Sequence, residues 1–216
     1  MGIFKALVAA IVVLLPLSQG VSAQGPECSS ADFDAVRDFS LNSNPTGVWS
    51  YGWETSARGP LTLYPEASSA CITGMGFWYA SPKCYPPLVA HNDTDQQICW
   101  ATLCVPPKYL ILHPGPTGQM TVVRWTAPSD GLYGIRGKIE GLDYAGPTST
   151  GFYAVMNSKV FLVRATIDSY KSPIIFHHRR RLLAGQTIDF VVDWGTNHNY
   201  GFDSTGVQFT VTPLGP

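Results

Sequence analysis

Two stretches decide the fold of this chain: Tyr133-Gly134-Ile135-Arg136-Gly137-Lys138-Ile139 and Val207-Gln208-Phe209-Thr210-Val211-Thr212. In both, apolar side chains or glycine alternate with polar ones, which is the period of a β-strand with one buried face. Other alternating segments lie between Thr121 and Thr212, with turn residues between them. Several such strands in series predict an all-β sandwich or barrel.

The same patterns place the individual strands. Asn157-Ser158 lies between two apolar runs and predicts a tight hairpin. Residues 33–39 predict either a short helix or the first strand. We expect the remaining strands over 48–53, 61–64, 109–112, 120–125, 132–139, 152–156, 159–167, 187–193 and 207–212.

The amino-terminal segment predicts export. Lys5 precedes an apolar run over 6–17, and small residues at 21–23 suit signal-peptide cleavage. The run is shorter than the roughly 20 residues that a bilayer span needs. We therefore expect a signal peptide over 1–23, with a retained anchor as the alternative. Residues 24–216 would form a single domain, secreted or at the cell surface, with no membrane span after cleavage.

Composition excludes some classes of function. Hydrophobic residues make up 45% of the chain and charged residues 13%, and the formal net charge is −1. This is typical of a globular core joined by tight turns. The charge balance gives no reason to expect nucleic-acid binding.

Segment 67–107 breaks the alternating pattern and predicts an irregular insertion stapled by disulfides. In an oxidising compartment its four cysteines should pair, and we favour Cys71–Cys84 and Cys99–Cys104 over the other two connectivities. Zinc is a weaker alternative, because the segment has no Cys-x-x-Cys pair.

Two further features accompany this segment. Cys28 lies apart and could compete for a partner, stay free or link chains. Asn92-Asp93-Thr94 is an N-glycosylation sequon, which predicts a surface loop there and Asn92 as the glycosylated residue.

Six blocks of sequence carry a resemblance to known proteins. They are Asp38-Phe39-Ser40, Asn44-Pro45-x-Gly47-x-Trp49-Ser50-Tyr51-Gly52, Leu112-His113-Pro114-Gly115, Val123-Arg124-Trp125-x-Ala127-Pro128-x-x-Gly131-x-Tyr133, Ala184-Gly185-x-Thr187-Ile188-Asp189-Phe190 and Asp203-Ser204-Thr205. The series resembles a jelly-roll domain of secreted bacterial proteins, often those with a PEP-CTERM sorting tail. More distantly, the closing pattern of Gly185, Ile188, Phe190, Asp203 and the final strand is similar to the last strands of galactose-binding-like carbohydrate-binding modules. The resemblance implies a two-sheet antiparallel jelly-roll sandwich, structural calcium, and sugar binding on loops or a concave sheet.

The loop 193–203 is the best candidate for a binding site, because it combines short polar side chains, aromatic rings and glycines. Exposed rings stack on the apolar faces of sugars. The candidate ligand-binding residues are Trp194, Asn197, His198, Asn199 and Tyr200, with Trp53, Trp78 and Tyr79 in or beside other turns. Calcium could be bound by Asp193, Asn197 and Asp203. The alternative is a polar turn whose Asp and Asn side chains bond their own backbone.

Charged residues on the expected strands give two more predictions. Arg124 lies among apolar residues, so we expect it to be partly buried and paired with Asp189 or Asp203. The basic cluster 177–181 predicts a solvated loop between strands, and the alternative is docking of an acidic polysaccharide or lipid headgroup. Trp49 and Trp125 should lie in the core.

The sequence holds no motif for an activated nucleophile, a metalloprotease or a phosphate loop. Glu54, Glu66 and Glu140 are present, but their spacing alone does not pair them for glycoside hydrolysis. We therefore expect a secreted, non-catalytic protein that binds extracellular polysaccharide or another glycan. The alternatives are a structural or adhesive surface protein that binds other proteins, and a small polysaccharide-active enzyme.

Overall fold

The computed structural model of the chain describes residue 2 and residues 32–215. These residues form two antiparallel β-sheets packed face to face and one two-stranded sheet, so the predicted all-β, two-sheet antiparallel sandwich is confirmed. None of them belongs to a helix long and apolar enough to cross a membrane. The signal peptide expected over 1–23 lies, apart from residue 2, outside the described residues, as does Cys28.

The larger sheet has the strand order β14-β11-β16-β9-β6-β5-β4, with β1 also paired to β16. Its strands are β1 (Phe33–Asp34), β4 (Glu66–Ser68), β5 (Met75–Tyr79), β6 (Leu88–Asn92), β9 (Leu110–His113), β11 (Gly131–Gly141), β14 (Ile174–Leu182) and β16 (Thr205–Pro213).

The smaller sheet has the order β13-β12-β15-β10-β2-β3. Its strands are β2 (Trp49–Glu54), β3 (Thr62–Leu63), β10 (Met120–Thr126), β12 (Thr150–Met156), β13 (Val160–Ile167) and β15 (Thr187–Asp193). From β9 to β16 the chain crosses between the two sheets at every connection except the β12–β13 hairpin. In that hairpin Asn157 and Ser158 both have positive φ, as the predicted tight turn requires.

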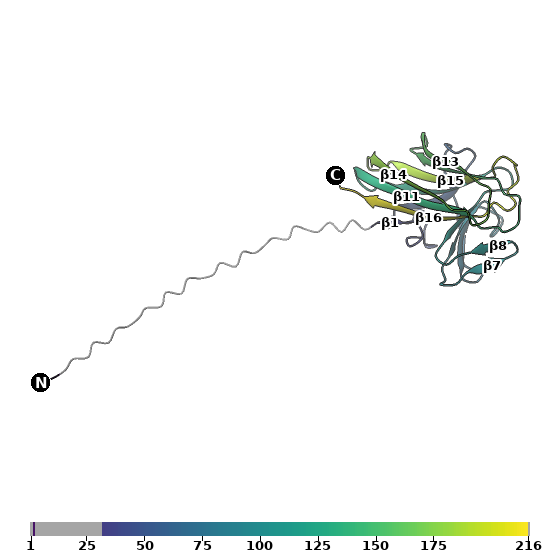
Figure 1. Cartoon of the computed structure of the whole chain (residues 1–216), viewed down its shortest axis with the longest axis horizontal. Coiled ribbons are helices and arrows are strands. Elements are labelled where there is room, and N and C mark those ends of the chain that lie inside the picture. The colour runs from purple at the N-terminus through teal and green to yellow at the C-terminus, as the bar shows by residue number, and fades with distance from the viewer. Residues whose placement is uncertain (1, 3–31, 216) are drawn as a thin grey trace.

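A separate hairpin of β7 (Ile98–Trp100) and β8 (Leu103–Val105) forms the two-stranded sheet. Figure 1 shows it at the opposite end of the molecule from the carboxyl terminus.

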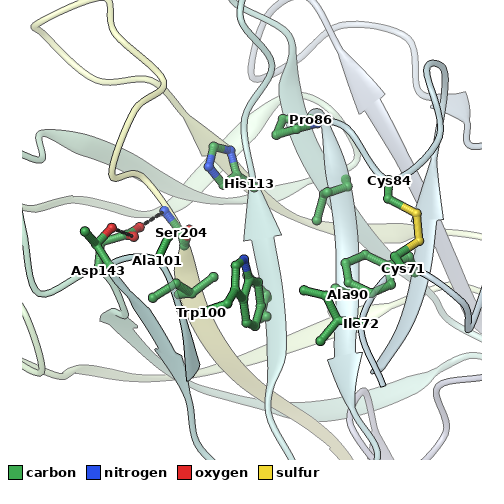
Figure 2. Close-up of a pocket in the computed structure, with 15 residues that line it drawn as sticks. Cys71, Ile72, Cys84, Pro86, Ala90, Trp100, Ala101, His113, Asp143 and Ser204 are labelled. Carbon is green, nitrogen blue, oxygen red and sulfur yellow. Dashed lines mark hydrogen bonds between the residues drawn. A yellow bond between two sulfur atoms is a disulfide. The ribbon is translucent and has the colours of Figure 1, made fainter. Parts of the chain in front are cut away.

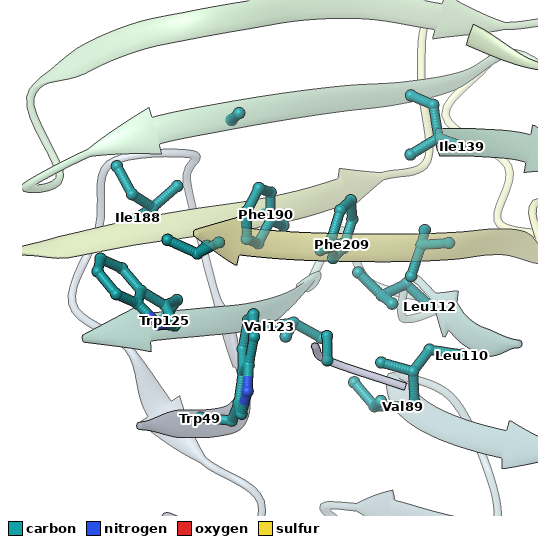
Figure 3. Close-up of a cluster of buried hydrophobic side chains, with 14 of the residues drawn as sticks. Trp49, Val89, Leu110, Leu112, Val123, Trp125, Ile139, Ile188, Phe190 and Phe209 are labelled. Atoms are coloured by element: carbon teal, nitrogen blue, oxygen red, sulfur yellow. The ribbon is translucent and has the colours of Figure 1, made fainter. Parts of the chain in front are cut away.

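The main core lies between the two large sheets and is built from the inward-facing residues of each alternating strand. Phe190 on β15 stacks on Phe209 of β16 with ring centroids 3.9 Å apart, which joins the two layers at their centre (Figure 3). Trp49 and Trp125 are buried in this core, as predicted.

The expectation of irregular structure over 67–107 is wrong in its central part, because β5 and β6 are inner strands of the larger sheet. Every residue of both strands is buried. One face of β5 and β6 packs in the main core and the other packs under the hairpin β7–β8. Strands buried on both faces lose the alternation that marks a half-buried strand.

The predicted disulfide pairing is confirmed. Cys71 is bonded to Cys84, and Cys99 to Cys104, with Cα–Cα distances of 6.0 and 4.2 Å. The second bond joins directly paired residues of β7 and β8 and so closes that hairpin covalently.

The expected loop at 177–181 is instead part of β14, which among the described strands pairs with β11 alone and forms an edge of the larger sheet. Charged residues are typical of edge strands, because they prevent pairing with another chain. Because of these charged residues, the apolar/polar pattern did not predict a strand there.

Arg124 is paired with Asp189, as predicted, where β10 and β15 lie side by side. The guanidinium donates from Nε and Nη2 to the two carboxylate oxygens, and the Nη2–Oδ2 distance is 2.9 Å. The Asp189 side chain is 2% exposed, so its charge depends on this partner.

We predict that Arg124→Met destabilises the protein by about 3–5 kcal/mol, because it leaves a buried carboxylate uncompensated. Urea unfolding followed by tryptophan fluorescence measures the change. The double variant Arg124→Met/Asp189→Leu should recover most of the loss, since it removes both charges. A loss below about 1 kcal/mol in the single variant would show that the pair is solvated.

Candidate functional site

A cavity of about 380 Å³ lies between the hairpin β7–β8 and the outer face of β5, β6 and β9 (Figure 2). We call it the hairpin cavity. Its apolar wall consists of Ile72, Phe77, Leu88, Ala90, Leu103 and Ile111, with the Cys71–Cys84 disulfide beside them. Trp100 lines it from the hairpin. Its volume falls within the range of small-ligand pockets.

One end of the hairpin cavity is polar. Asp143 accepts hydrogen bonds from the Thr102 hydroxyl to Oδ1 and from the Ser204 backbone N–H to Oδ2, each at 3.0 Å. Figure 2 shows this Asp143–Ser204 contact and the His113 ring at the same end. Each carboxylate oxygen keeps a lone pair that a ligand donor could use.

His113 adds another acceptor. Its Nδ1 lies 2.9 Å from the Pro114 carbonyl oxygen, which can only accept, so Nδ1 carries the proton. Burial lowers the pKa of His113, and the ring is therefore neutral near pH 7 with an unprotonated Nε2. The polar end thus presents acceptors, and a matching ligand must bring donors such as hydroxyl groups.

Four tyrosines contact residues that line the cavity or one another close to them. Tyr85 lies between two lining residues and is 41% exposed, and its hydroxyl is 2.7 Å from that of Tyr200. The Tyr200 ring meets the His113 ring edge-on at 5.8 Å. On the other side, Tyr144 donates its hydroxyl to the Ala101 carbonyl and packs against Tyr170. Exposed phenol rings with a polar edge are suited to contact a sugar.

The structure separates the residues that the sequence grouped in the loop 193–203. Tyr200 reaches the hairpin cavity through His113. Asp193, Thr196 and His198 line a different groove of about 540 Å³, together with Tyr153 and Arg164. We call this the loop groove. Trp194 contacts the His198 ring and the backbone at Gly118, where an added Cβ would lie 2.9 Å from the indole.

The three side chains considered for calcium are engaged with the protein itself. Asp193 accepts from the Gly151 and Gly195 backbone N–H groups and from the Tyr153 hydroxyl. Asn197 accepts from the Asn199 backbone N–H.

Asp203 Oδ1 accepts from the hydroxyls of Thr148 and Thr150, and the buried Oδ2 has no hydrogen-bond partner among the residues that the structure describes. Within 32–215 no group of three or more His, Cys, Asp or Glu residues is placed to hold a metal. Asp193, Asn197 and Asn199 bond backbone N–H groups of the loop itself, whereas Asp193 and Asp203 also bond residues of the segment 148–153, and calcium there stays a prediction.

Three aromatic residues are not exposed as the sequence suggested. Trp78 points into the main core and donates its indole N–H to the Ser40 carbonyl. Tyr79 packs beneath the hairpin, and Trp53 packs against the main core. None of the three lines the hairpin cavity or the loop groove.

Asn92 is also placed differently from the expected surface loop. It is 0% exposed, and its amide donates to the carbonyls of Gln96, Val105 and Pro106. Its carbonyl accepts from the Thr94 backbone N–H and hydroxyl. The sequon therefore holds the end of β6 in place, and attachment of a glycan at Asn92 would have to precede folding.

Three residues that line the hairpin cavity were not singled out as site residues from the sequence: Trp100, His113 and Asp143. They come from three separate segments that only the sheet topology brings together. One local signal was available, because Cys99 and Cys104 bracket Trp100 and their bond holds this ring on a short hairpin.

The three glutamates noted in the sequence do not meet. Glu54 lies on the outer face of the smaller sheet, Glu66 on the exposed edge strand β4, and Glu140 bonds the Tyr109 hydroxyl and Lys138 on the larger sheet. Glu54 is 1% exposed and neither carboxyl oxygen has a hydrogen-bond partner within 32–215. Burial and the nearby Asp189 raise the pKa of Glu54 to about 8, against a smaller opposing effect of Arg124.

Comparisons with known proteins give only distant matches. No protein-family model matches the chain, and no curated protein matches it. Among solved structures, a family 35 carbohydrate-binding module from an environmental isolate is 15% identical, with 49% of this chain and 74% of that chain covered and a TM-score of 0.33. A family 35 module from Clostridium thermocellum is 14% identical, with 54% and 87% covered and a TM-score of 0.31.

Rabbit GITRL matches at a similar level, with 18% identity, 43% and 73% covered and a TM-score of 0.31. Carbohydrate-binding modules of families 35 and 6 are thus among the matches, in keeping with the distant resemblance to such modules. No comparison supports the resemblance to PEP-CTERM proteins. Likenesses at these TM-scores carry no argument about the site or its ligand.

The burial of Glu54 predicts a pH-dependent stability. Its pKa is about 8 in the folded chain and near 4.5 when exposed, so the folded state keeps a proton that the unfolded state releases. This contribution is complete below about pH 4.5 and is lost as the pH rises through 8. Glu54→Gln should match the wild type at pH 4.5 and melt at least ~3 °C higher at pH 8.

Differential scanning calorimetry between pH 4.5 and 8.5 measures this. Glu66→Gln, at an exposed glutamate, is the matched control and should follow the wild type. If the difference in melting temperature between the wild type and Glu54→Gln is the same at every pH, Glu54 is not buried as a neutral acid.

The calcium prediction can be tested by the same method. If calcium occupies the loop 193–203, EDTA should lower the melting temperature and excess calcium should restore it, because a ligand bound to the folded state stabilises it. Asn197→Ala should remove the effect. An unchanged melting temperature across chelated and calcium-loaded samples would contradict a structural calcium ion.

Proposed function

We propose that this is an exported, non-catalytic carbohydrate-binding protein that holds a sugar in the hairpin cavity. The observation that carries the proposal is that Trp100 and an apolar wall line the same cavity as the acceptor-bearing side chains of His113 and Asp143. A sugar ring has an apolar face and a rim of hydroxyl donors, and this cavity offers a partner for each.

A non-catalytic role is supported by the carboxylates of the cavity. Among the described residues that line it, Asp143 is the one acidic side chain. Canonical glycoside hydrolysis uses a pair of carboxyl groups across the bond to be cleaved. Asp143 also accepts two hydrogen bonds from the protein, which suits an orienting acceptor better than a proton donor.

An extracellular location is supported by the two disulfides, because such bonds persist in oxidising compartments. They also hold the cavity together: Cys71–Cys84 lies in its wall, and Cys99–Cys104 closes the hairpin that covers it. A sugar site held by two disulfides would be rigid before the ligand binds, and this rigidity reduces the conformational entropy lost on binding.

We predict that Trp100→Ala weakens binding of neutral oligosaccharides about tenfold, because stacking on a ring contributes on the order of 1 kcal/mol. A glycan array selects the ligand, and isothermal titration calorimetry measures affinity. Trp100→Phe should lose less, since it keeps an apolar ring.

Trp194→Ala is the matched control, because this second half-buried tryptophan lies by the loop groove. Near-ultraviolet circular dichroism checks that each variant is folded. The assignment to the hairpin cavity is wrong if Trp194→Ala loses binding and Trp100→Ala keeps it. Binding of no neutral or acidic glycan would overturn the proposed function itself.

A further inference from the structure

The outer face of β14, β11 and β16 carries a concentration of positive charge. Residues that pair directly across a sheet project from the same face. Arg136 pairs with His177, Lys138 with Ile175, and Gly134 with Arg179. Arg181 pairs with Leu132 one step further along. We call the surface formed by Arg136, Lys138, His177, Arg179 and Arg181 the basic face.

Burial confirms which way these side chains point. Ile135 and Ile139 of β11 and Phe176 and Leu182 of β14 lie in the main core. The alternate residues therefore face outward. Arg136, His177, Arg179 and Arg181 are all exposed, and Ile175 between them is 76% exposed.

Most of this charge is unbalanced within the described part of the chain. Lys138 is paired with Glu140 at the border of the face. No carboxylate among residues 32–215 forms an ion pair with Arg136, Arg179 or Arg181. The chain as a whole has a formal net charge of −1, so the cations are segregated here and do not reflect a basic composition.

This segregation has an energetic cost. Along one strand, Arg179 and Arg181 are separated by about 7 Å, and neighbouring strands lie about 5 Å apart. Both spacings are shorter than the Debye length of about 8 Å at physiological ionic strength, so the charges repel one another. A bound polyanion would remove that repulsion and gain charge-assisted hydrogen bonds to the guanidinium groups.

The neighbouring strand β16 adds uncharged hydrogen-bonding groups. Thr210 pairs with Arg136, Gln208 with Lys138, and Thr212 with Gly134, so all three face the same side. A shallow hollow of about 220 Å³ is lined by Arg136, Lys138, Ile175, Gln208 and Thr210. Cations beside amide and hydroxyl groups are complementary to a ligand that carries both acidic groups and free hydroxyls.

We propose that the basic face binds an extended acidic polysaccharide, with Arg136, Arg179 and Arg181 contacting its carboxylate or sulfate groups and Gln208 and Thr210 its hydroxyls. Single-stranded nucleic acid is a poorer match, because such sites stack bases on aromatic rings and the outward residues of these three strands include no Phe, Tyr or Trp. The basic face lies on different strands from most of the hairpin cavity, so this inference does not rest on the proposed function.

The test is titration calorimetry of the full secreted chain with oligogalacturonate and with heparin oligosaccharides at 50 and 200 mM salt. Binding to at least one should be detectable at 50 mM and weaken with salt. Arg179→Gln/Arg181→Gln should reduce its affinity at least about tenfold, because it removes two charged hydrogen-bond donors from the basic face. Thermal unfolding should show that this double variant and the control variant described next are folded.

The control is Arg58→Gln/Arg164→Gln, which removes the same charge from two exposed arginines that stack on Phe161 of the other sheet. It should bind like the wild type. Equal weakening by the control pair, or no binding of either acidic probe at 50 mM salt, overturns the inference. The inference is also overturned if single-stranded DNA, or vesicles containing anionic lipid, bind more tightly than both acidic polysaccharide probes.

Neutral oligosaccharide binding separates this inference from the proposed function. Arg179→Gln/Arg181→Gln should leave it unchanged, and Trp100→Ala should leave acidic polysaccharide binding unchanged. Loss of one activity without the other identifies which proposal fails.

Discussion

The outer face of β5, β6 and β9 is largely apolar and must be shielded from water, and the hairpin β7–β8, the disulfides and the hairpin cavity all follow from this constraint. Met75, Phe77, Ala90 and Ile111 all project from that face. Two short strands and two disulfides form the cover, whose Leu103 and Val105 are themselves buried against it. Because the hairpin spans the face without filling it completely, the cover leaves the hairpin cavity.

The same sheet is left open on its other half. Across β11, β14 and β16 most outward residues are charged or polar, with Leu132 and Ile175 among them, and no described sheet packs on this face. The border between the halves is marked by a polar contact, in which Lys138 bonds the Tyr109 hydroxyl and Glu140 accepts from that hydroxyl. One sheet thus offers a covered apolar pocket and an open cationic surface.

The sequence predicted the strands in which residues of different polarity face the two sides of the sheet. β10, β11 and β16 each contribute one face to the main core, and β15, although almost entirely buried, keeps the pattern because its alternate residues include Asp189 and Asp193. It failed for β5 and β6, which are buried on both sides, and for the edge strand β14, where charges replace the apolar residues. Both errors have the same cause, since periodicity reports only the contrast between two faces of a strand.

The candidate site was harder to predict than the fold. Tyr200 was singled out and lies near the hairpin cavity, but His113, Trp100 and Asp143 become neighbours only through the pairing of distant strands. The cysteine pairing was predictable because each bond closes a short local segment. The position of Asn92 was not predictable in this way, because the sequon is typical of a surface loop whereas the Asn92 amide is buried and bonds the backbone.

The most direct test of this account is an NMR titration of the isotope-labelled protein with a neutral oligosaccharide selected by the array. The account predicts that shifts concentrate at the Trp100 indole, the His113 ring and the amides of 98–105, while the amides of β14 stay unchanged. Shifts confined to the loop groove, or spread over the basic face, would contradict the division of the larger sheet into a covered sugar site and an open cationic surface.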